Sequence, residues 1–338
     1  MAGRPQSALL SLSDTELSPP KPAKPHFRHA LHHAERDWPQ TNCYVDLLIE
    51  LVAMRGFEPE AMLGFTLAQD FEEDQLTFFK PRLADLERLY GLRVEELALY
   101  DRLDDHIARQ TARGRVVMVE VDGYHLPDTR GVTYRIDHSK TTIGVTEIDL
   151  SARRIDYFHN DGYFALDGED FDAIFGRAGE ARDLAALFPY AEFVRFDRER
   201  THADLRGTAE ELAREHFARR PSDNPIRAFA ARFPALWNVL EARPPCFFHS
   251  LAFNTFRQLG ANFELLGSHL DWLRPDGDLA AEAEACRRIS AGAKAMQFQA
   301  ARASARKRVY DPRETLDELA GVYDGLFGGL SAKLRRDR

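Results

Sequence analysis

The spacing of hydrophobic residues changes twice along the chain, and these changes limit the folds that it can adopt. Apolar side chains recur mainly at helical spacing through residues 26–113. Between residues 116 and 196 they form β-branched runs and alternating segments that are typical of strands. From about residue 201 to the end, the helical spacing returns. Helices followed by strands that pair with their neighbours predict an α+β fold built on an antiparallel sheet.

Turn and cap residues mark the ends of the individual elements. Asn42 is a good N-cap for a helix that begins at residue 43, and Gly56 follows that helix as a C′ residue. Further helical segments are expected at residues 60–68, 83–90 and 94–113. Strands are expected at residues 116–121, 141–148, 155–159 and 192–196. A turn at residues 151–154 would join the second and third strands into a hairpin.

The chain divides into three expected segments. Residues 1–25 are rich in Ser, Pro and Lys and poor in apolar residues, which predicts a disordered leader. Residues 26–200 hold the first helices and the strands and would form the α+β domain. Residues 201–338 would form a helical domain or cap, interrupted at residues 243–245 and 274–277.

Composition excludes several classes of protein. The formal net charge of −9 argues against a general nucleic-acid binder. No apolar run approaches the roughly 18 residues that span a bilayer, and no signal peptide is evident. The three cysteines lie far apart without a CxxC pair, so reduced thiols are expected. We therefore expect a cytoplasmic protein that binds neither membrane nor nucleic acid.

Cys43 is the cysteine whose position is suggestive of chemistry. It stands at the start of the first expected helix, where unpaired N–H groups and the helix dipole stabilise a thiolate. A cysteine there is either a small buried hydrophobe or a nucleophile. Cys246 and Cys286 have no comparable position.

A nucleophilic cysteine needs a base and a group that orients the base. His138 stands just before the strand at residues 141–148, and Asn160 and Asp161 follow the strand at residues 155–159. Because the far ends of hairpin strands meet, His138 should lie near Asn160 or Asp161. Both remain candidates for the orienting group.

Two other histidines compete with His138 for the role of base. His125 lies in an expected turn, where an exposed polar role is favoured. His159 belongs to an expected strand and is most simply a hydrogen-bonding side chain.

Several motifs resemble a bacterial family of unknown function, DUF1839. The resemblance covers most of the chain and is carried by residues 138–143, 157–160, 248–253 and 257–265. More loosely, residues 30–175 are similar to papain-like domains of the C39-like and butirosin-H-like branches. That similarity rests on residues 119–127 and on the order of cysteine, histidine and Asn or Asp. It implies a papain-like cysteine-enzyme fold followed by an all-helical region.

The papain-like resemblance also implies a chemistry. Butirosin-H-like proteins move an acyl group from a carrier-protein thioester to an amine, which would make Cys43 the acyl acceptor, His138 the base and Asn160 the orienting group. Papain-like enzymes usually place an oxyanion-hole Gln about six residues before the cysteine. Here that position is Asp37, and the available donor is Gln40.

The resemblance thus implies a bacterial acyltransferase or aminoacyltransferase that works through a Cys43 acyl-enzyme. A small-molecule amine would be the acceptor. We expect no bound cofactor and no metal, and phosphopantetheine would arrive on a partner acyl-carrier protein. The alternatives are a cysteine peptidase or amidase on the same residues, and a catalytically inactive papain-like binding module.

A basic segment could dock such a carrier protein. Residues 287–308 contain no Asp or Glu and seven basic residues, which are Arg287, Arg288, Lys294, Arg302, Arg306, Lys307 and Arg308. In an acidic protein this stripe would attract an acidic carrier or a phosphate group. The alternative is an ordinary solvated helix face.

Four histidines before the first helix have spacings that suit metal ligands. His26, His29, His32 and His33 are three or four residues apart in several pairs. No carboxylate partner is evident in the sequence, so a solvated face is the favoured interpretation. No Walker A loop or GxGxxG motif suggests a nucleotide site.

Overall fold

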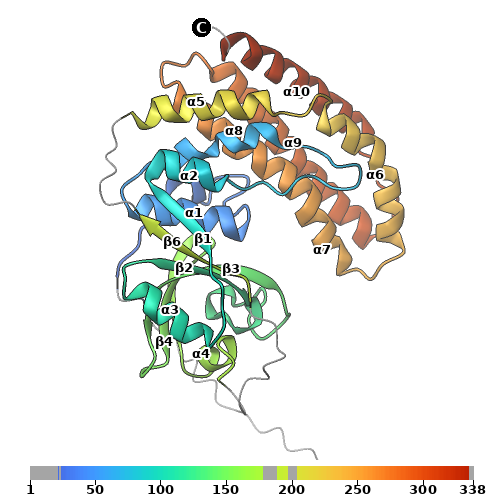
Figure 1. Ribbon diagram of the computed structural model, residues 1–338. Helices are drawn as coiled ribbons and strands as arrows, with labels where there is room; N and C mark the ends of the chain where they lie inside the picture. Colours follow the sequence, from blue (N-terminus) through green and yellow to red (C-terminus); the bar gives the residue numbers. More distant parts are fainter. Residues whose placement is uncertain (1–21, 23, 178–188, 197–203, 335–338) are drawn as a thin grey trace, which may run out of the picture.

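The computed structural model describes residues 22, 24–177, 189–196 and 204–334 (Figure 1). Most of the expected leader and the expected boundary near residue 200 lie outside these residues. The described chain forms a mixed α/β structure with a C-terminal helical region. Figure 1 shows α5–α10 gathered at one end of the molecule and α3 and α4 at the other, beyond the sheet.

Six strands of the described chain form one antiparallel sheet in the order β1-β6-β2-β3-β4-β5. They are β1 (Leu92–Glu96), β2 (Val116–Asp122), β3 (Lys140–Asp149), β4 (Arg154–His159), β5 (Gly162–Asp167) and β6 (Ala191–Phe196). The expectation of an antiparallel sheet is therefore confirmed. The strands predicted from the sequence correspond to β2, β3, β4 and β6.

Two strands were not anticipated, and one predicted helix is wrong. Residues 94–113 do not form one helix, because β1 occupies residues 92–96 and α3 (Leu103–Thr111) covers only the later part. Val94 of β1 pairs with Val194 of β6, a partner 100 residues away. β5 follows β4 through a turn at Asn160, whose φ of 47° is left-handed. The sequence indicated this turn but not the strand after it.

Helices cover both faces of the sheet. α1 (Cys43–Met54) packs on β3 and β4, where a Cβ on Gly144 would lie only 3.1 Å from Leu47 Cδ1. The opposite face is covered by α3 and α4 (Gly168–Ile174), and its core includes Ile107 and Val145. Because Gly144 and Val145 are adjacent, the strand alternation directs β3 into both cores.

The first helices follow the sequence closely. Asn42 caps α1 by accepting a hydrogen bond from the Val45 N–H at 3.0 Å, and Gly56 follows with a φ of 80°. α2 (Leu83–Tyr90) ends at Gly91, as expected. Residues 59–68 form a 3₁₀ segment, η2 (Pro59–Ala68), which packs against α5 and α8 and joins the sheet part to the helical region.

The C-terminal region is helical, as predicted. It comprises α5 (Leu205–Ala218), α6 (Pro225–Glu241), α7 (Phe247–Ala252), the π-helical turn η5 (Phe253–Arg257), α8 (Gln258–Leu273), α9 (Ala280–Ala305) and α10 (Arg313–Lys333). Two of its breaks lie at the predicted residues 243–245 and 274–277, and two others, at residues 219–224 and 306–312, were not predicted. Within the described ranges, no helix combines the length and apolar character needed to cross a membrane.

Residues 37–41, just before α1, are held by the helical region. Glu264 of α8 accepts hydrogen bonds from the backbone N–H groups of residues 37 and 38 at 2.9 and 3.0 Å. Arg257 donates to the carbonyl oxygens of residues 40 and 41 at 2.5 and 3.0 Å. The Trp38 ring lies against Gly260, where a Cβ would come within 2.5 Å of it, and its Nε1 donates to Ser290 of α9. The start of α1 is therefore positioned by both halves of the chain.

Candidate functional site

Cys43 occupies the first residue of α1 and borders two pockets. Its side chain is partly exposed. One pocket, of about 350 Å³, lies toward β2 and β6 and includes Glu120 and Glu192 in its lining. The other, of about 550 Å³, lies between the sheet and the helical region. Cys43 is therefore a lining residue of two cavities.

The 550 Å³ pocket collects polar groups from four parts of the chain. Cys43 and Gln40 come from the start of α1, and Thr141 from the start of β3. His159 and Asn160 come from the end of β4, and the opposite wall is formed by residues of α7 and η5. The ends of β3 and β4 do meet here, as their hairpin predicted.

His159 is held at both ring nitrogens. Its Nδ1 lies 2.5 Å from Asp128 Oδ2, and its Nε2 lies 2.8 Å from Thr141 Oγ1. The second Asp128 oxygen accepts a hydrogen bond from Tyr157 at 2.5 Å. A carboxylate assigns the proton of a neutral imidazole to Nδ1, so Nε2 is the acceptor and the Thr141 hydroxyl donates to it. Hydroxyl, imidazole and carboxylate are thereby aligned in the order found in hydrolase triads.

Asp128 was not identified as a site residue from the sequence. It lies in a short 3₁₀ turn, η4 (Pro127–Thr129), after β2. Burial is the main cause of the raised pKa of the neighbouring Tyr157, and the Asp128 charge raises it further. Tyr157 therefore stays protonated and donates to Asp128. No local pattern indicates this contact, because Asp128 and His159 are 31 residues apart.

His138 lies outside both pockets that Cys43 borders. Its side chain is 73% exposed, its Nδ1 is 2.5 Å from Asp122 Oδ2, and its ring stacks on Tyr124 at 4.5 Å. The physical reason is the strand register: Ile143 pairs with His159, so Thr141, two residues before Ile143, is the side chain that reaches the His159 ring, while His138 lies beyond the start of β3 beside Asp122. His125 also lies outside these pockets and packs edge-on against Tyr124 at 5.1 Å.

The predicted orienting and oxyanion groups are connected to each other. Asn160 lines the 550 Å³ pocket at its left-handed turn. Asp161 is buried and accepts a hydrogen bond from Gln40 Nε2 at 2.9 Å, while Arg28 lies 3.2 Å from its other oxygen. The Gln40 amide N–H is therefore directed at Asp161 in this conformation. The catalytic roles of these residues stay predictions.

His32 corrects the expectation of a solvated histidine face. Its side chain is fully buried, with Nδ1 2.5 Å from Glu50 and Nε2 3.3 Å from Asp46. Both carboxylates come from α1, and Asp46 also accepts hydrogen bonds from Thr41 N–H and Oγ1 at 2.8 and 2.6 Å. These partners could not be recognised from the sequence because they lie 14 and 18 residues further along the chain. The cluster ties the segment before α1 to the helix that carries Cys43.

This buried cluster predicts how stability depends on pH. Burial alone lowers the pKa of His32, but hydrogen bonds to Asp46 and Glu50 outweigh burial and raise it from 6.5 to about 9. A raised histidine pKa stabilises the fold fully below pH 6.5, and this contribution is lost as the pH rises through 9. The expected loss between pH 6.5 and 9 is on the order of 3 kcal/mol.

Glu50 determines how the same cluster contributes to stability at low pH. Burial alone raises its pKa, but hydrogen bonds from His26 and His32 lower it from 4.5 to about 2. Its contribution is present above pH 4.5 and is lost as the pH falls through 2.

Urea unfolding at pH 6 and pH 9 measures the loss of stability that is expected from His32. If the unfolding free energy of a His32→Ala variant fell by the same amount between these two pH values, the loss would be due to other groups.

The predicted carrier-docking residues are divided between paired and open positions. Arg287 pairs with Asp271 and Glu284, each at 2.8 Å, and Arg288 pairs with Glu318 at 3.2 Å. Lys294 lies 4.2 Å from the Trp38 ring and donates to the Asp37 carbonyl. In contrast, Lys307 and Arg308 line a pocket of about 370 Å³ with Arg243. The remaining two stripe residues are Arg302 and Arg306. The stripe is therefore not one continuous free surface.

Comparison with known proteins identifies the family. The model of the DUF1839 N-terminal domain matches residues 27–196, and the model of the DUF1839 C-terminal domain matches residues 202–332. No curated protein matches the chain. Since these two models together cover nearly the whole sequence, the chain belongs to the DUF1839 family.

Proposed function

We propose that the protein is an acyltransferase that forms an acyl-enzyme on Cys43 and passes the acyl group to an amine. The observation that carries this proposal is that Cys43 and His159 line one pocket, with His159 oriented by Asp128. His159 takes the role of base that the sequence assigned to His138, because His138 borders neither pocket. In this proposal α1 and the β3–β4 ends correspond to a papain-like arrangement.

The proposed reaction has two steps. In the first, the Cys43 sulfur attacks the carbonyl of a thioester, its proton passes to His159 Nε2, and the departing thiolate takes that proton. In the second, an amine attacks the Cys43 thioester, His159 accepts a proton from the amine, and the Cys43 thiolate is released and reprotonated. Asp128 accepts the Nδ1 hydrogen bond throughout and stabilises the imidazolium that forms. Cys43 lies at the positive end of the α1 dipole, which would stabilise its thiolate.

Thr141 must release His159 for this reaction to proceed. In the structure the Thr141 hydroxyl is hydrogen-bonded to His159 Nε2, the atom that would accept the proton from Cys43. A hydroxyl rotates at little cost, so Thr141 can release Nε2 by a local change of its side-chain torsions. We propose that Thr141 holds the ring in place before the thioester binds.

The acyl donor in this proposal is carried by phosphopantetheine on an acyl-carrier protein. The pockets beside Cys43 admit a narrow thioester arm, and basic residues near the end of α9 would meet an acidic carrier surface. Electrostatic attraction of this kind chiefly raises the association rate and weakens with salt.

The test is intact-mass spectrometry after incubation with a small acyl thioester, such as an acyl-N-acetylcysteamine. We expect one acyl adduct on the wild-type protein and none on Cys43→Ala. Cys246→Ala is the matched control, because Cys246 is an exposed cysteine outside the site. An unchanged adduct in Cys43→Ala would overturn the role of Cys43.

A second candidate is an enzyme in which the Thr141 hydroxyl is the nucleophile. It is favoured by the 2.8 Å hydrogen bond to His159 Nε2. In that case the adduct would survive in Cys43→Ala and disappear in Thr141→Val, which keeps the shape of the side chain.

Product analysis with and without an added amine separates acyl transfer from hydrolysis by a peptidase or amidase. Absence of any adduct with carrier-bound and small thioesters would favour an inactive binding module.

A further inference from the structure

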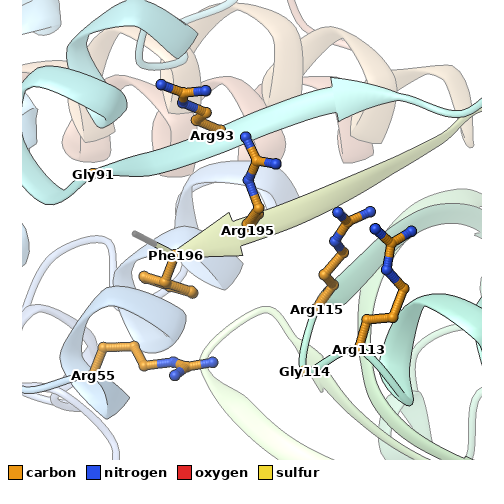
Figure 2. A pocket seen from close by; sticks show the side chains of 8 residues that line it. All are labelled: Arg55, Gly91, Arg93, Arg113, Gly114, Arg115, Arg195 and Phe196. Carbon is orange, nitrogen blue, oxygen red and sulfur yellow. The ribbon is translucent and has the colours of Figure 1, made fainter. Parts of the chain in front are cut away.

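Five arginines gather around one pocket at the far end of α1 from Cys43 (Figure 2). Arg55 follows α1, Arg93 lies on β1 and Arg195 on β6, while Arg113 and Arg115 flank Gly114 between α3 and β2. The pocket has a volume of about 660 Å³. Four separate segments thus converge on one strongly basic concavity in a protein whose formal net charge is −9.

Three of these arginines, Arg113, Arg115 and Arg195, have no ion-pair partner among the described residues. Arg93 pairs with Glu87 at 2.5 Å. Arg115 donates to the neutral amide oxygen of Gln110 at 2.7 Å. The positive charge in the pocket is therefore only partly compensated within the described chain.

Aromatic contacts hold two of the guanidinium groups in position. Arg55 lies over the Phe196 ring at 4.3 Å, and Arg115 lies over the Phe193 ring at 4.4 Å. Burial lowers the pKa of Arg115, the charges of Arg113 and Arg195 lower it further, and the charge of Glu95 opposes them. All three arginines line the same pocket, where a bound anion would relieve their mutual repulsion.

The chemistry of the pocket lining suits phosphate. Gly91 and Gly114 also border the pocket, and their φ values of 64° and 74° are left-handed conformations that favour glycine. Arginine binds phosphate through two parallel N–H donors, which makes it the preferred residue for phosphate recognition. A single phosphate offers few acceptor oxygens, whereas linked phosphates offer more acceptors and more negative charge to a lining of five arginines.

We propose that this arginine pocket binds an oligophosphate, two or more linked phosphates such as those of nucleoside diphosphates and triphosphates. It is a separate site from the Cys43 pockets, because the 12 residues of α1 span about 18 Å between Cys43 and Arg55. It does not depend on the acyl transfer proposed above. Sequence motifs gave no sign of it, since the contributing segments are distant along the chain and contain no Walker A loop.

Calorimetric titration of the full chain at low salt tests the proposal with tripolyphosphate, ATP, AMP and inorganic phosphate. We expect tripolyphosphate and ATP to bind, and AMP and phosphate to bind at least tenfold more weakly. Equal affinity for ATP and tripolyphosphate would assign recognition to the phosphates alone, and tighter ATP binding would add a nucleoside contact. Both results support an oligophosphate site, and the affinity should fall as salt is added.

Matched variants locate the binding. Arg113→Gln combined with Arg195→Gln should weaken tripolyphosphate binding by about 100-fold, because each guanidinium group makes a charge-assisted hydrogen bond. Arg287→Gln combined with Arg288→Gln removes the same charge from paired surface positions and should change affinity by less than about threefold. Arg113→Lys with Arg195→Lys keeps the charge but loses the paired donors, so its affinity should lie between the two.

Three results would overturn the proposal. The first is no binding of tripolyphosphate or ATP at millimolar concentration. The second is unchanged binding in the Arg113→Gln, Arg195→Gln variant. The third is tighter binding of a single-stranded oligonucleotide than of tripolyphosphate with the same dependence on these arginines, which would indicate a nucleic-acid surface. Circular dichroism and thermal unfolding of each variant confirm that the fold is retained.

Discussion

A His32→Ala variant should lose about 3–5 kcal/mol of unfolding free energy, because it leaves two buried carboxylates without their shared partner. Glu50 and Asp46 flank the His32 ring at 2.5 and 3.3 Å, and all three side chains are buried. Truncation removes the compensating hydrogen bonds and opens a cavity beside α1. Chemical denaturation at pH 6 measures the loss, since the imidazole is protonated there.

His33→Ala is the matched control for this measurement. The His33 side chain is 50% exposed and lies 3.5 Å from an exposed Glu35, so its removal should change stability by no more than about 0.5 kcal/mol. Equal effects of the two substitutions would contradict the structural role of the His32 cluster.

A His159→Ala variant should lower the rate of Cys43 acylation by about 10²–10⁴-fold, the usual contribution of a general base. His159 lines the Cys43 pocket and is buried, with Asp128 fixing its Nδ1. Stopped-flow release of thiol from a small thioester measures the acylation step. Unfolding curves of the same variant separate loss of the base from loss of the fold.

His138→Ala tests the alternative base directly. Its exposed ring borders neither Cys43 pocket, so this substitution should change the acylation rate by less than about threefold. A larger loss in His138→Ala than in His159→Ala would restore His138 as the base. Asp128→Asn should shift the pH profile of acylation, because an amide cannot stabilise the imidazolium as a carboxylate does.

The sequence identified elements whose signals are local. α1 was predicted together with its N-cap at Asn42 and its C′ residue at Gly56, because capping and helical spacing are properties of neighbouring residues. β1 was missed because five residues give little pattern of their own. Its stability comes from pairing with β6, a contact that no local pattern reveals.

The same limit applies to the site. The sequence placed Cys43 at a helix start and the ends of β3 and β4 beside each other, and both features are present. It could not determine the register between β3 and β4, in which Ile143 pairs with His159 and Thr141 instead of His138 contacts the His159 ring. Asp128 and the arginine pocket depend on turns and strand ends that only the tertiary structure brings together.

The contacts around Trp38 have a consequence for how this family can vary. The indole ring fits against Gly260 and bonds to Ser290, so two positions in the second family segment determine where the cysteine of the first segment stands. An exchange of C-terminal segments between family members would therefore transmit its effects to the thiol, even if every residue around His159 were preserved. A graft that replaces only the C-terminal segment of this chain would therefore disturb the position of the cysteine before it disturbed the sheet.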